Sequence, residues 1–305
     1  MQPHARRSTL LGLGAVLLWA LLAALTLYAG KIPPFQLVAM TFAIGTLVGL
    51  IYVWMTGQSL AELRDVPLGA HALGMYGLLG FHVCYFFALQ NAPALEVSLI
   101  VYLWPLLIVL FTGMLSNAAG GGLRWWHVAG AVLGFAGVVI ILLGEPSQNV
   151  SHGSGHGPVI MQAGFGVVMA SMAAFIWSSY SVASRLYAHV PSSAVIASCA
   201  ATTIGATLLH LALEVSAWPS SLGAWLAVFG LGLGPVGIAF YIWDDGMKRG
   251  DIRLLGVAAY ATPLLSTLIL ALLGHGSASS GIWLAALLIT GGALLASVDK
   301  FGRRR

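Results

Sequence analysis

Long apolar runs separated by short loops are the feature that most constrains this chain. Each run is long enough to cross the hydrocarbon core of a bilayer as an α-helix, which takes about 20 residues. Only 7% of the 305 residues are charged and 59% are hydrophobic, so a soluble fold has too little polar surface to cover itself. We therefore expect an all-α integral membrane protein with ten transmembrane helices. They lie at about 8–29, 35–56, 70–90, 95–115, 125–143, 160–185, 193–213, 222–243, 254–274 and 281–299.

The distribution of Lys and Arg predicts how these helices are oriented. If both termini lie on one side, that side receives every one of the 13 basic residues except Lys31. Positively charged loops stay in the cytoplasm, so we expect both termini to be cytoplasmic. The basic residues sit at helix ends, including the C-terminal segment "KFGRRR". This placement favours contact with the lipid bilayer over binding to nucleic acid.

The two halves of the chain correspond at a shift of 158 residues. We interpret this match as a duplication within a single transporter domain, 1–305. Repeat one covers about 8–143, repeat two about 160–299, and the Gly- and Ser-rich stretch at about 144–159 is an outer linker. The matched pairs are Trp19 and Trp177, Pro33 and Pro191, Tyr102 and Tyr260, Pro105 and Pro263, Trp125 and Trp283, and Gly134 and Gly292.

The number of helices in each copy decides how the copies are related. Each copy holds five helices, so the second enters the membrane from the opposite side and the repeats are inverted. Inverted repeats are typical of transporters that work by alternating access, with the substrate site near the membrane midplane. The repeat also makes the first apolar run a mature helix and not a cleaved signal peptide.

Polar and aromatic side chains near the span centres are candidates for the substrate pathway, because lipid cannot satisfy polar groups. The helical period places Ser98, Tyr102 and Pro105 on one face of the fourth span, and Tyr260 and Pro263 repeat that face in the ninth. Interior packing is the alternative for each of them. The remaining candidates are His82, Tyr85, Trp177 with Tyr180, and Trp19 as the repeat mate of Trp177.

Prolines and interfacial tryptophans have simpler interpretations. Pro105, Pro235 and Pro263 lie inside spans, where a proline removes a backbone donor, so we expect them to be flexing points. Tryptophans near span ends are expected to anchor the protein at the membrane surface. These are Trp54, Trp125, Trp126, Trp218, Trp225 and Trp283.

Charged residues are missing from the span centres. Asp244 and Asp245 come closest, but Lys248 and Arg249 follow them near the cytoplasmic end, which favours a gate or a helix-end salt bridge over proton coupling. A pump with a buried carboxylate relay normally shows an acidic residue at mid-span. The sequence thus favours a facilitator.

Metal and cofactor chemistry has little support. His152 and His156 lie in the Gly- and Ser-rich linker without a carboxylate or cysteine between them, so we expect a solvated linker. Cys84 and Cys199 lie in apolar runs and are expected to pack as small hydrophobes. We expect no metal, no cofactor and no enzyme activity, since His82 is not paired with a nucleophile.

The order and spacing of several segments resemble a known family, the EamA-type drug/metabolite transporters. These segments are "WALLAAL" and "WSSYSVASRL" in the first helix of each half, and "YLWPLL" and "YATPLL" in the fourth. The stretch "HVCYFFALQNAPALEVSLIVYLWPLL" looks most like members in the bacterial inner membrane that export aromatic amino acids. This resemblance implies a central cavity lined by aromatics, here Tyr85, Tyr102, Trp104 and Trp177. Trp104 lies on a different helix face from Tyr102, so it either joins the cavity or packs behind it.

One family feature is absent. Many relatives end the fourth helix of each half with a glutamate, and "FTGML" and "ILALLG" contain none, so a role for that residue does not carry over. The resulting hypothesis is a monomeric exporter of aromatic or neutral hydrophobic amino acids in the bacterial cytoplasmic membrane. The alternative cargo is a lipophilic cation such as methyl viologen or another small metabolite. A channel, a scaffold and an intramembrane enzyme are less well supported alternatives.

Overall fold

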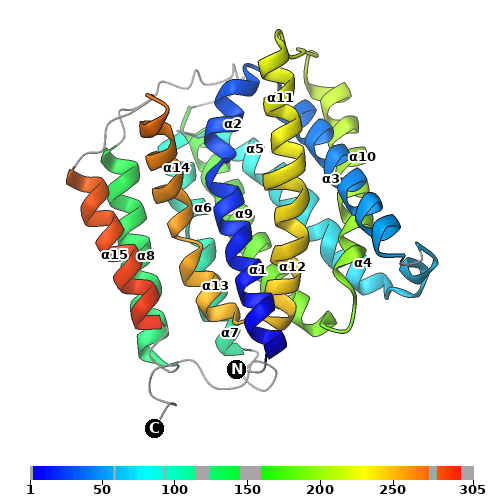
Figure 1. The fold of residues 1–305 in the computed structure, drawn as a ribbon. Coiled ribbons are helices and arrows are strands. Elements are labelled where there is room, and N and C mark those ends of the chain that lie inside the picture. The colour runs from blue at the N-terminus through cyan, green and yellow to red at the C-terminus, as the bar shows by residue number, and fades with distance from the viewer. Residues whose placement is uncertain are drawn as a thin grey trace. The chain divides into compact units, whose positions relative to one another are not determined.

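The structure is a computed structural model that describes residues 3–57, 60–92, 94–114, 124–144, 159–274 and 280–296. Two expected segments lie outside these residues. They are the outer linker with its two histidines, of which only residues 144 and 159 are described, and the C-terminal basic segment. Within the described ranges every regular element is a helix (Figure 1). The expected all-α fold class is therefore confirmed.

The helices of the first half follow the expected apolar runs, but three runs are interrupted. The first is broken between α1 and α2, the third contains the π-helical turn η2, and the fourth is broken between α6 and α7. The elements are α1 (Pro3–Ala20), α2 (Leu22–Ala29), α3 (Pro34–Thr56), η1 (Leu60–Asp65), α4 (Leu68–Met75), η2 (Tyr76–Gly80), α5 (Phe81–Asn91), α6 (Ala94–Val101), α7 (Trp104–Met114) and α8 (Trp125–Gly144).

The second half has interruptions of the same kind. A second π-helical segment, η5, lies within the eighth run, and the ninth run is broken between α13 and α14. The elements are α9 (Val159–Ala183), η3 (Ser184–Tyr187), η4 (Ser192–Ala194), α10 (Val195–Leu213), α11 (Leu222–Leu231), η5 (Gly232–Ile238), α12 (Ala239–Arg249), α13 (Ile252–Ala258), α14 (Ala261–Leu272) and α15 (Ser280–Ala296).

Seven helical stretches among the described residues are long and apolar enough to cross a membrane, with mean hydropathies between 1.5 and 2.4. Residues 125–140 and 283–292 form two shorter apolar helices. A chain with this many apolar helices is a multi-pass membrane protein. The seven stretches are His4–Ala29, Pro34–Thr56, Leu68–Asn91, Gly164–Tyr187, Ser192–Leu213, Leu222–Arg249 and Ile252–Leu272.

Most of the tryptophans expected at the membrane surface are exposed. Five of the six have between 44% and 81% of their surface accessible, and Trp126 is half-buried. Large exposed aromatics are suited to the lipid interface and not to water. The five are Trp54, Trp125, Trp218, Trp225 and Trp283.

The breaks in the fourth and ninth runs occur at matching tyrosines, each three residues before a proline. Next to Tyr102, the N–H of Leu103 donates to Ile100 O, three residues back and not four, at 3.1 Å. Around Tyr260 the N–H of Thr262 reaches Ala259 O at 3.0 Å. A proline removes the donor that such a carbonyl has in a regular helix. The tighter turn at Ala259 therefore satisfies the carbonyl that Pro263 leaves free.

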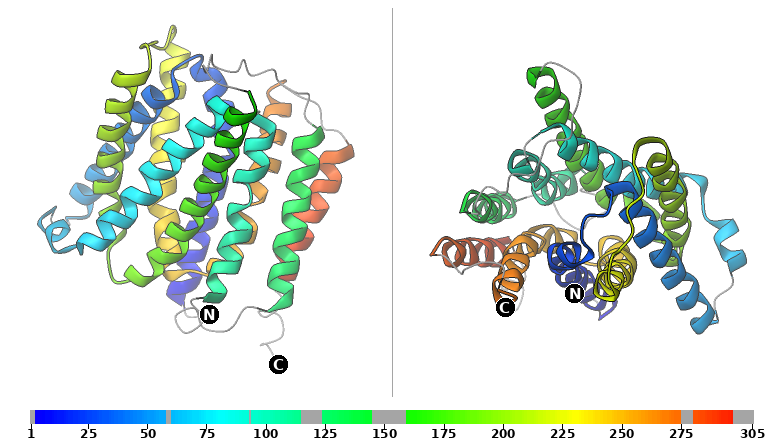
Figure 2. Two further views of the ribbon diagram at one scale, coloured as in Figure 1. Left: turned by 180° about the vertical axis from the view of Figure 1, so that it is seen from behind. Right: turned by 90° about the horizontal axis from the view of Figure 1, so that it is seen from above.

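The described helices cluster into two compact units, each drawn from both halves of the sequence. Unit 1 contains residues 1–80 and 183–250, and unit 2 contains residues 81–182 and 251–305. The chain passes from unit 1 to unit 2 directly after η2. In unit 1, α1 packs on α12, α3 on α10, and α2 on α11. In unit 2, α8 packs along α15 and α7 on α13, and Figure 2 shows α8 (green) beside α15 (red) in both views.

Close backbone contact joins α3 to η5 in unit 1. A Cβ atom built on Gly45 would lie 3.4 Å from the Cα of Gly237, and one on Gly232 would overlap the side chain of Ile44. The Tyr241 hydroxyl donates to Gly45 O at 3.0 Å. Small residues allow helices to approach this closely in a membrane protein. The side of η5 that faces α3 is thus held by backbone packing.

The core of unit 2 forms where α7, α8, α13, α14 and α15 meet. Two glycines matched at the 158-residue shift, Gly134 and Gly292, lie here. A Cβ on Gly134 would collide with the Tyr260 ring, and one on Gly292 would collide with Gly130 O. The buried residues of this core are Val109, Ala131, Val138, Val257, Tyr260, Leu264, Ala285 and Ile289.

Candidate functional site

An aromatic cluster in unit 2 brings together five of the expected substrate-binding residues. Phe81, at the start of α5, lies at its centre, because its ring stacks on Tyr85 at 5.6 Å and meets Trp177 of α9 at 5.4 Å. Trp177 also contacts Tyr180 at 5.5 Å and Trp104 of α7 at 6.3 Å. His82 completes the cluster, edge-on to Phe81 at 5.1 Å.

The cluster has a buried side and a partly open side. Trp104, Trp177 and Tyr180 are 8%, 5% and 5% exposed. The α5 side chains His82 and Tyr85 are half-buried. The more exposed polar members of the cluster therefore come from α5. Trp104 contacts the Trp177 ring edge-to-face, at 88°, so it belongs to the cluster.

Phe81 is the member of this cluster that sequence reasoning missed. Phenylalanine has no polar group, so the search for polar side chains near span centres did not distinguish Phe81 from other apolar residues of the third span. The available signal was its spacing, because Phe81 precedes Tyr85 by four residues and falls on the same helix face. Phe81 is also the first residue of α5, directly after the π-helical η2.

The other candidates from the fourth and ninth spans are also in unit 2. Tyr102 is half-buried and packs against the unit 2 core, and Ser98 is half-buried one turn earlier in α6. Tyr260 is fully buried within the core, 6.3 Å from the Phe135 ring. Pro105 and Pro263 are buried just after the two breaks. These residues therefore gather around the two breaks.

Trp19 lies in unit 1, unlike its repeat mate Trp177. Its indole N–H donates to Pro235 O at 3.0 Å, inside η5. Its ring packs 4.9 Å from Trp243 and 6.1 Å from Phe240, both in α12. Trp19 is 7% exposed, so this side chain is almost completely buried.

The acidic residues of α12 form helix-end salt bridges. Asp244 and Lys248 are 4% and 6% exposed and form an ion pair of 2.8 Å, and Asp245 pairs with Arg249. Lys248 and Arg249 each also donate to Val190 O at 3.3 Å. These i, i+4 pairs support the last turn of α12. They explain why the helix continues to Arg249, six residues beyond the expected end of the run.

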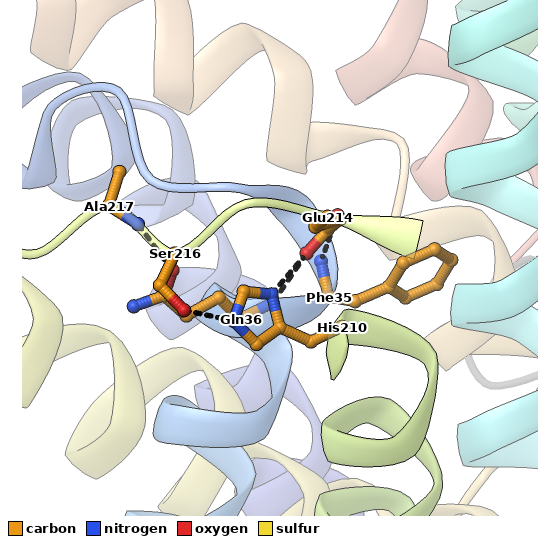
Figure 3. Close-up of polar contacts among 6 residues, drawn as sticks. All are labelled: Phe35, Gln36, His210, Glu214, Ser216 and Ala217. Atoms are coloured by element: carbon orange, nitrogen blue, oxygen red, sulfur yellow. Dashed lines mark hydrogen bonds and ion pairs between the residues drawn. The ribbon is translucent and has the colours of Figure 1, made fainter. Parts of the chain in front are cut away.

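A second polar cluster, also missed by sequence reasoning, joins the end of α10 to the start of α3 (Figure 3). The Glu214 carboxylate accepts the backbone N–H groups of Phe35 and Gln36 at 3.0 and 3.1 Å. His210 lies between Glu214 and Ser216, with ring nitrogens 2.8 and 2.9 Å from their oxygens. A carboxylate at this position satisfies otherwise unpaired N–H groups at a helix N-terminus. We call these residues the α3–α10 clasp.

Metal ligands are not gathered anywhere in the described ranges. No group of three or more His, Cys, Asp or Glu side chains there has the arrangement of a metal site. Cys84 and Cys199 are buried free thiols.

The long apolar helices define a multi-pass membrane protein, and comparison with known proteins gives its family. The EamA-like transporter family matches residues 6–143 and 164–298. The chain belongs to this family, and it is therefore a membrane transport protein.

Particular relatives are similar over nearly their whole length. The aromatic amino acid exporter YddG of Ancylobacter novellus is 47% identical over 292 residues, which is 95% of this chain and 97% of that protein. The exporter of the same name from Escherichia coli is 27% identical over 95% of this chain and 96% of its own. A solved crystal structure with 45% identity has a TM-score of 0.88 and covers 99% of this chain and 100% of its own.

Proposed function

We propose that this protein exports aromatic or neutral hydrophobic amino acids across a bacterial cytoplasmic membrane. The observation that carries the proposal is the Phe81 cluster, whose half-buried aromatic side chains on α5 are backed by Trp104 and Trp177. The similarity to exporters of aromatic amino acids supports the same substrate class. We assign substrate contact to Tyr85, His82 and Trp177, with Trp104 and Tyr180 packed against Trp177.

The chemistry of these rings fits an amino acid with an aromatic side chain. Offset or edge-to-face ring pairs contribute about 0.5–1.5 kcal/mol beyond the burial of their area. An aromatic face also attracts the ammonium group of the substrate without a buried carboxylate. A neutral aromatic site therefore suits both the side chain and the ammonium group of an aromatic amino acid.

We further propose ten membrane spans arranged as two inverted five-helix repeats, with both termini in the cytoplasm. The two ranges matched by the family support the duplication, since they agree with the expected repeats. The irregular turns support it as well, because η2 (Tyr76–Gly80) and η5 (Gly232–Ile238) lie at corresponding positions of the two halves. The helix breaks at Tyr102 and Tyr260 also support the duplication, because they are 158 residues apart.

We propose alternating access as the mechanism, and a facilitator that runs down the substrate gradient. The buried acids of unit 1 support the facilitator. Asp244 is paired with Lys248, and Glu214 is occupied by two backbone N–H groups and His210. Acidic groups bound in this way serve structure and are poorly placed to carry protons. The breaks near Pro105 and Pro263, and Pro235 in η5, are the points at which spans bend.

Counterflow in proteoliposomes tests the substrate and the mechanism. Vesicles loaded with unlabelled phenylalanine are expected to accumulate labelled phenylalanine, tryptophan and tyrosine with saturable initial rates. Trp54→Ala is the control for substitutions of the cluster aromatics and is expected to transport like the wild type. Trp54 is 81% exposed near a span end and belongs to no site. Absence of counterflow for all three amino acids refutes the substrate class. An initial flux that depends on an imposed pH gradient refutes the facilitator.

Lipophilic cations are the second candidate cargo, because aromatic faces bind quaternary ammonium groups as well as substrate amines. Competition decides between the two. Methyl viologen that inhibits phenylalanine counterflow, and is itself transported, favours the drug exporter. Phenylalanine counterflow that resists excess methyl viologen favours the amino acid exporter.

A further inference from the structure

The π-helical η5 has a geometry that its own backbone does not stabilise. The N–H of Ala239 bonds to Gly234 O, five residues back, instead of four. Pro235 lies inside the segment and has no N–H to donate. A π-helical turn is less favourable than a regular α-helical turn, and it is maintained where neighbouring groups hold it. The contacts around η5 therefore decide whether the span stays bent.

One side of η5 is held by α3. Gly45 of α3 approaches Gly237 so closely that a Cβ on Gly45 would lie 3.4 Å from the Gly237 Cα. A Cβ on Gly237 itself would collide with Gly232 O within the π-helical turn. This contact is between backbones, and α3 also contacts α12 through the bond from the Tyr241 hydroxyl to Gly45 O.

A side chain of α1, Trp19, contacts η5 as well. Trp19 donates its indole N–H to Pro235 O at 3.0 Å, and its ring contacts Phe240 and Trp243 in α12. Phe240 in turn stacks on Phe42 of α3 at 5.4 Å. Trp19 thus touches both sides of the junction at Ala239, where η5 ends and α12 begins. All of these contacts lie within unit 1.

We propose that Trp19 is a positioning residue whose indole N–H maintains the bend between η5 and α12, and thereby sets the rate of transport and not substrate affinity. A change of η5 to regular α-helix moves the Pro235 carbonyl away from a ring that Phe240 and Trp243 hold in place. The indole N–H then loses its bond to Pro235 O, which is unfavourable for a buried donor. The bond therefore favours the bent form selectively. This inference rests on the proposed transport function for its effect on rate.

The hydrogen bond is neutral and buried, so its removal shifts the balance between bent and regular forms by about 2- to 10-fold. A transporter that works by alternating access adopts each of its conformations once in every turnover. Depopulation of one conformation slows the step that depends on it. The maximal rate falls, while a substrate site in unit 2 keeps its affinity.

The experiment compares Trp19→Phe with Trp177→Phe in proteoliposomes, using phenylalanine counterflow over a range of concentrations. Trp19→Phe removes the N–H and retains an aromatic ring, and the same exchange in the repeat mate is the matched control. We expect Trp19→Phe to lower the maximal rate about 2- to 10-fold with KM changed less than twofold. Trp177→Phe is expected to raise KM. A raised KM with an unchanged maximal rate in Trp19→Phe overturns the proposal.

A second measurement does not require transport. Hydrogen–deuterium exchange followed by mass spectrometry reports opening of the backbone in residues 230–240. We expect faster exchange in this segment for Trp19→Phe and wild-type exchange for Trp177→Phe. Equal exchange in wild type and Trp19→Phe overturns the positioning role. Failure of the wild type to transport phenylalanine, with the exchange difference present, counts against the proposed substrate and leaves the role of Trp19 in η5 standing.

A shape-matched variant separates loss of the bond from poor folding. Replacement of Trp19 by 3-benzothienylalanine preserves the bicyclic ring and substitutes sulfur for the N–H. We expect it to reproduce the faster exchange of residues 230–240 and the lower maximal rate. Wild-type behaviour in both measurements shows that ring packing alone positions α12 and overturns the proposal for the N–H.

Discussion

Glu214 in the α3–α10 clasp provides the sharpest prediction of the energetics of this fold. Its carboxylate accepts two backbone N–H groups of α3, at 3.0 and 3.1 Å, and lies 2.8 Å from His210 Nδ1. The side chains of His210 and Glu214 are only 9% and 8% exposed, so water replaces these partners poorly. Glu214→Ala leaves three polar groups without their acceptor at once.

The magnitude follows from these contacts. A hydrogen bond to a charged group contributes about 1.5–3 kcal/mol, and the loss of one partner from a buried pair destabilises by about 3–5 kcal/mol. The three bonds share one carboxylate and are not additive. We therefore expect Glu214→Ala to lower the free energy of unfolding by about 3 kcal/mol. Glu214→Gln retains one acceptor oxygen and is expected to lose about 1–2 kcal/mol.

Reversible unfolding in mixed detergent micelles measures both variants. Asp65→Asn is the matched control, because Asp65 is an exposed acid of unit 1, and it is expected to change stability by less than about 0.5 kcal/mol. A double-mutant cycle of Glu214→Gln with His210→Gln is expected to give a coupling energy of at least about 0.5 kcal/mol. A loss below about 1 kcal/mol for Glu214→Ala, or no coupling, refutes the reasoning.

Three further predictions follow from other contacts. Lys248→Met leaves the Asp244 carboxylate buried and unpaired, so we expect a loss of about 3–5 kcal/mol in the same unfolding assay, largely restored when Asp244→Asn is added; equal losses in the single and double variants contradict this. Tyr241→Phe removes the bond to Gly45 O and is expected to lose about 0.5–1.5 kcal/mol, whereas unchanged stability argues against that bond. Tyr85→Ala removes a stacked ring and is expected to raise the KM for phenylalanine about 2- to 10-fold in counterflow, and an unchanged KM excludes Tyr85 from the substrate site.

The aromatic residues of the two units differ in a way that bears on substrate binding. In unit 1, Trp19, Phe240 and Trp243 are 7%, 7% and 1% exposed, so their rings are fully packed. The unit 2 cluster contains the half-buried Tyr85 and His82. Residues 82 and 85 correspond to Phe240 and Trp243 at the 158-residue shift. Similar aromatic groups thus lie in both units, and those of unit 2 include the more exposed side chains.

Sequence alone determined where the helices lie, because a chain in lipid must satisfy its backbone groups within each segment. The expected run at 35–56 became α3 at Pro34–Thr56, and the run at 125–143 became α8 at Trp125–Gly144. Hydropathy is a local property, so it needs no knowledge of neighbouring helices. The spacing of the charged residues likewise predicted the salt bridges at the end of α12.

Tertiary structure decided which of the candidate residues meet. Trp19 and Trp177 look equivalent in sequence, yet Trp19 binds Pro235, which is 216 residues away, and Trp177 packs on Phe81. Glu214 caps a helix that begins about 180 residues earlier, at Phe35 and Gln36. Such contacts depend on which helix faces which, and no local pattern encodes that choice. Helix positions therefore came from the preference of each segment for lipid, and the candidate site came from packing between segments distant in the chain.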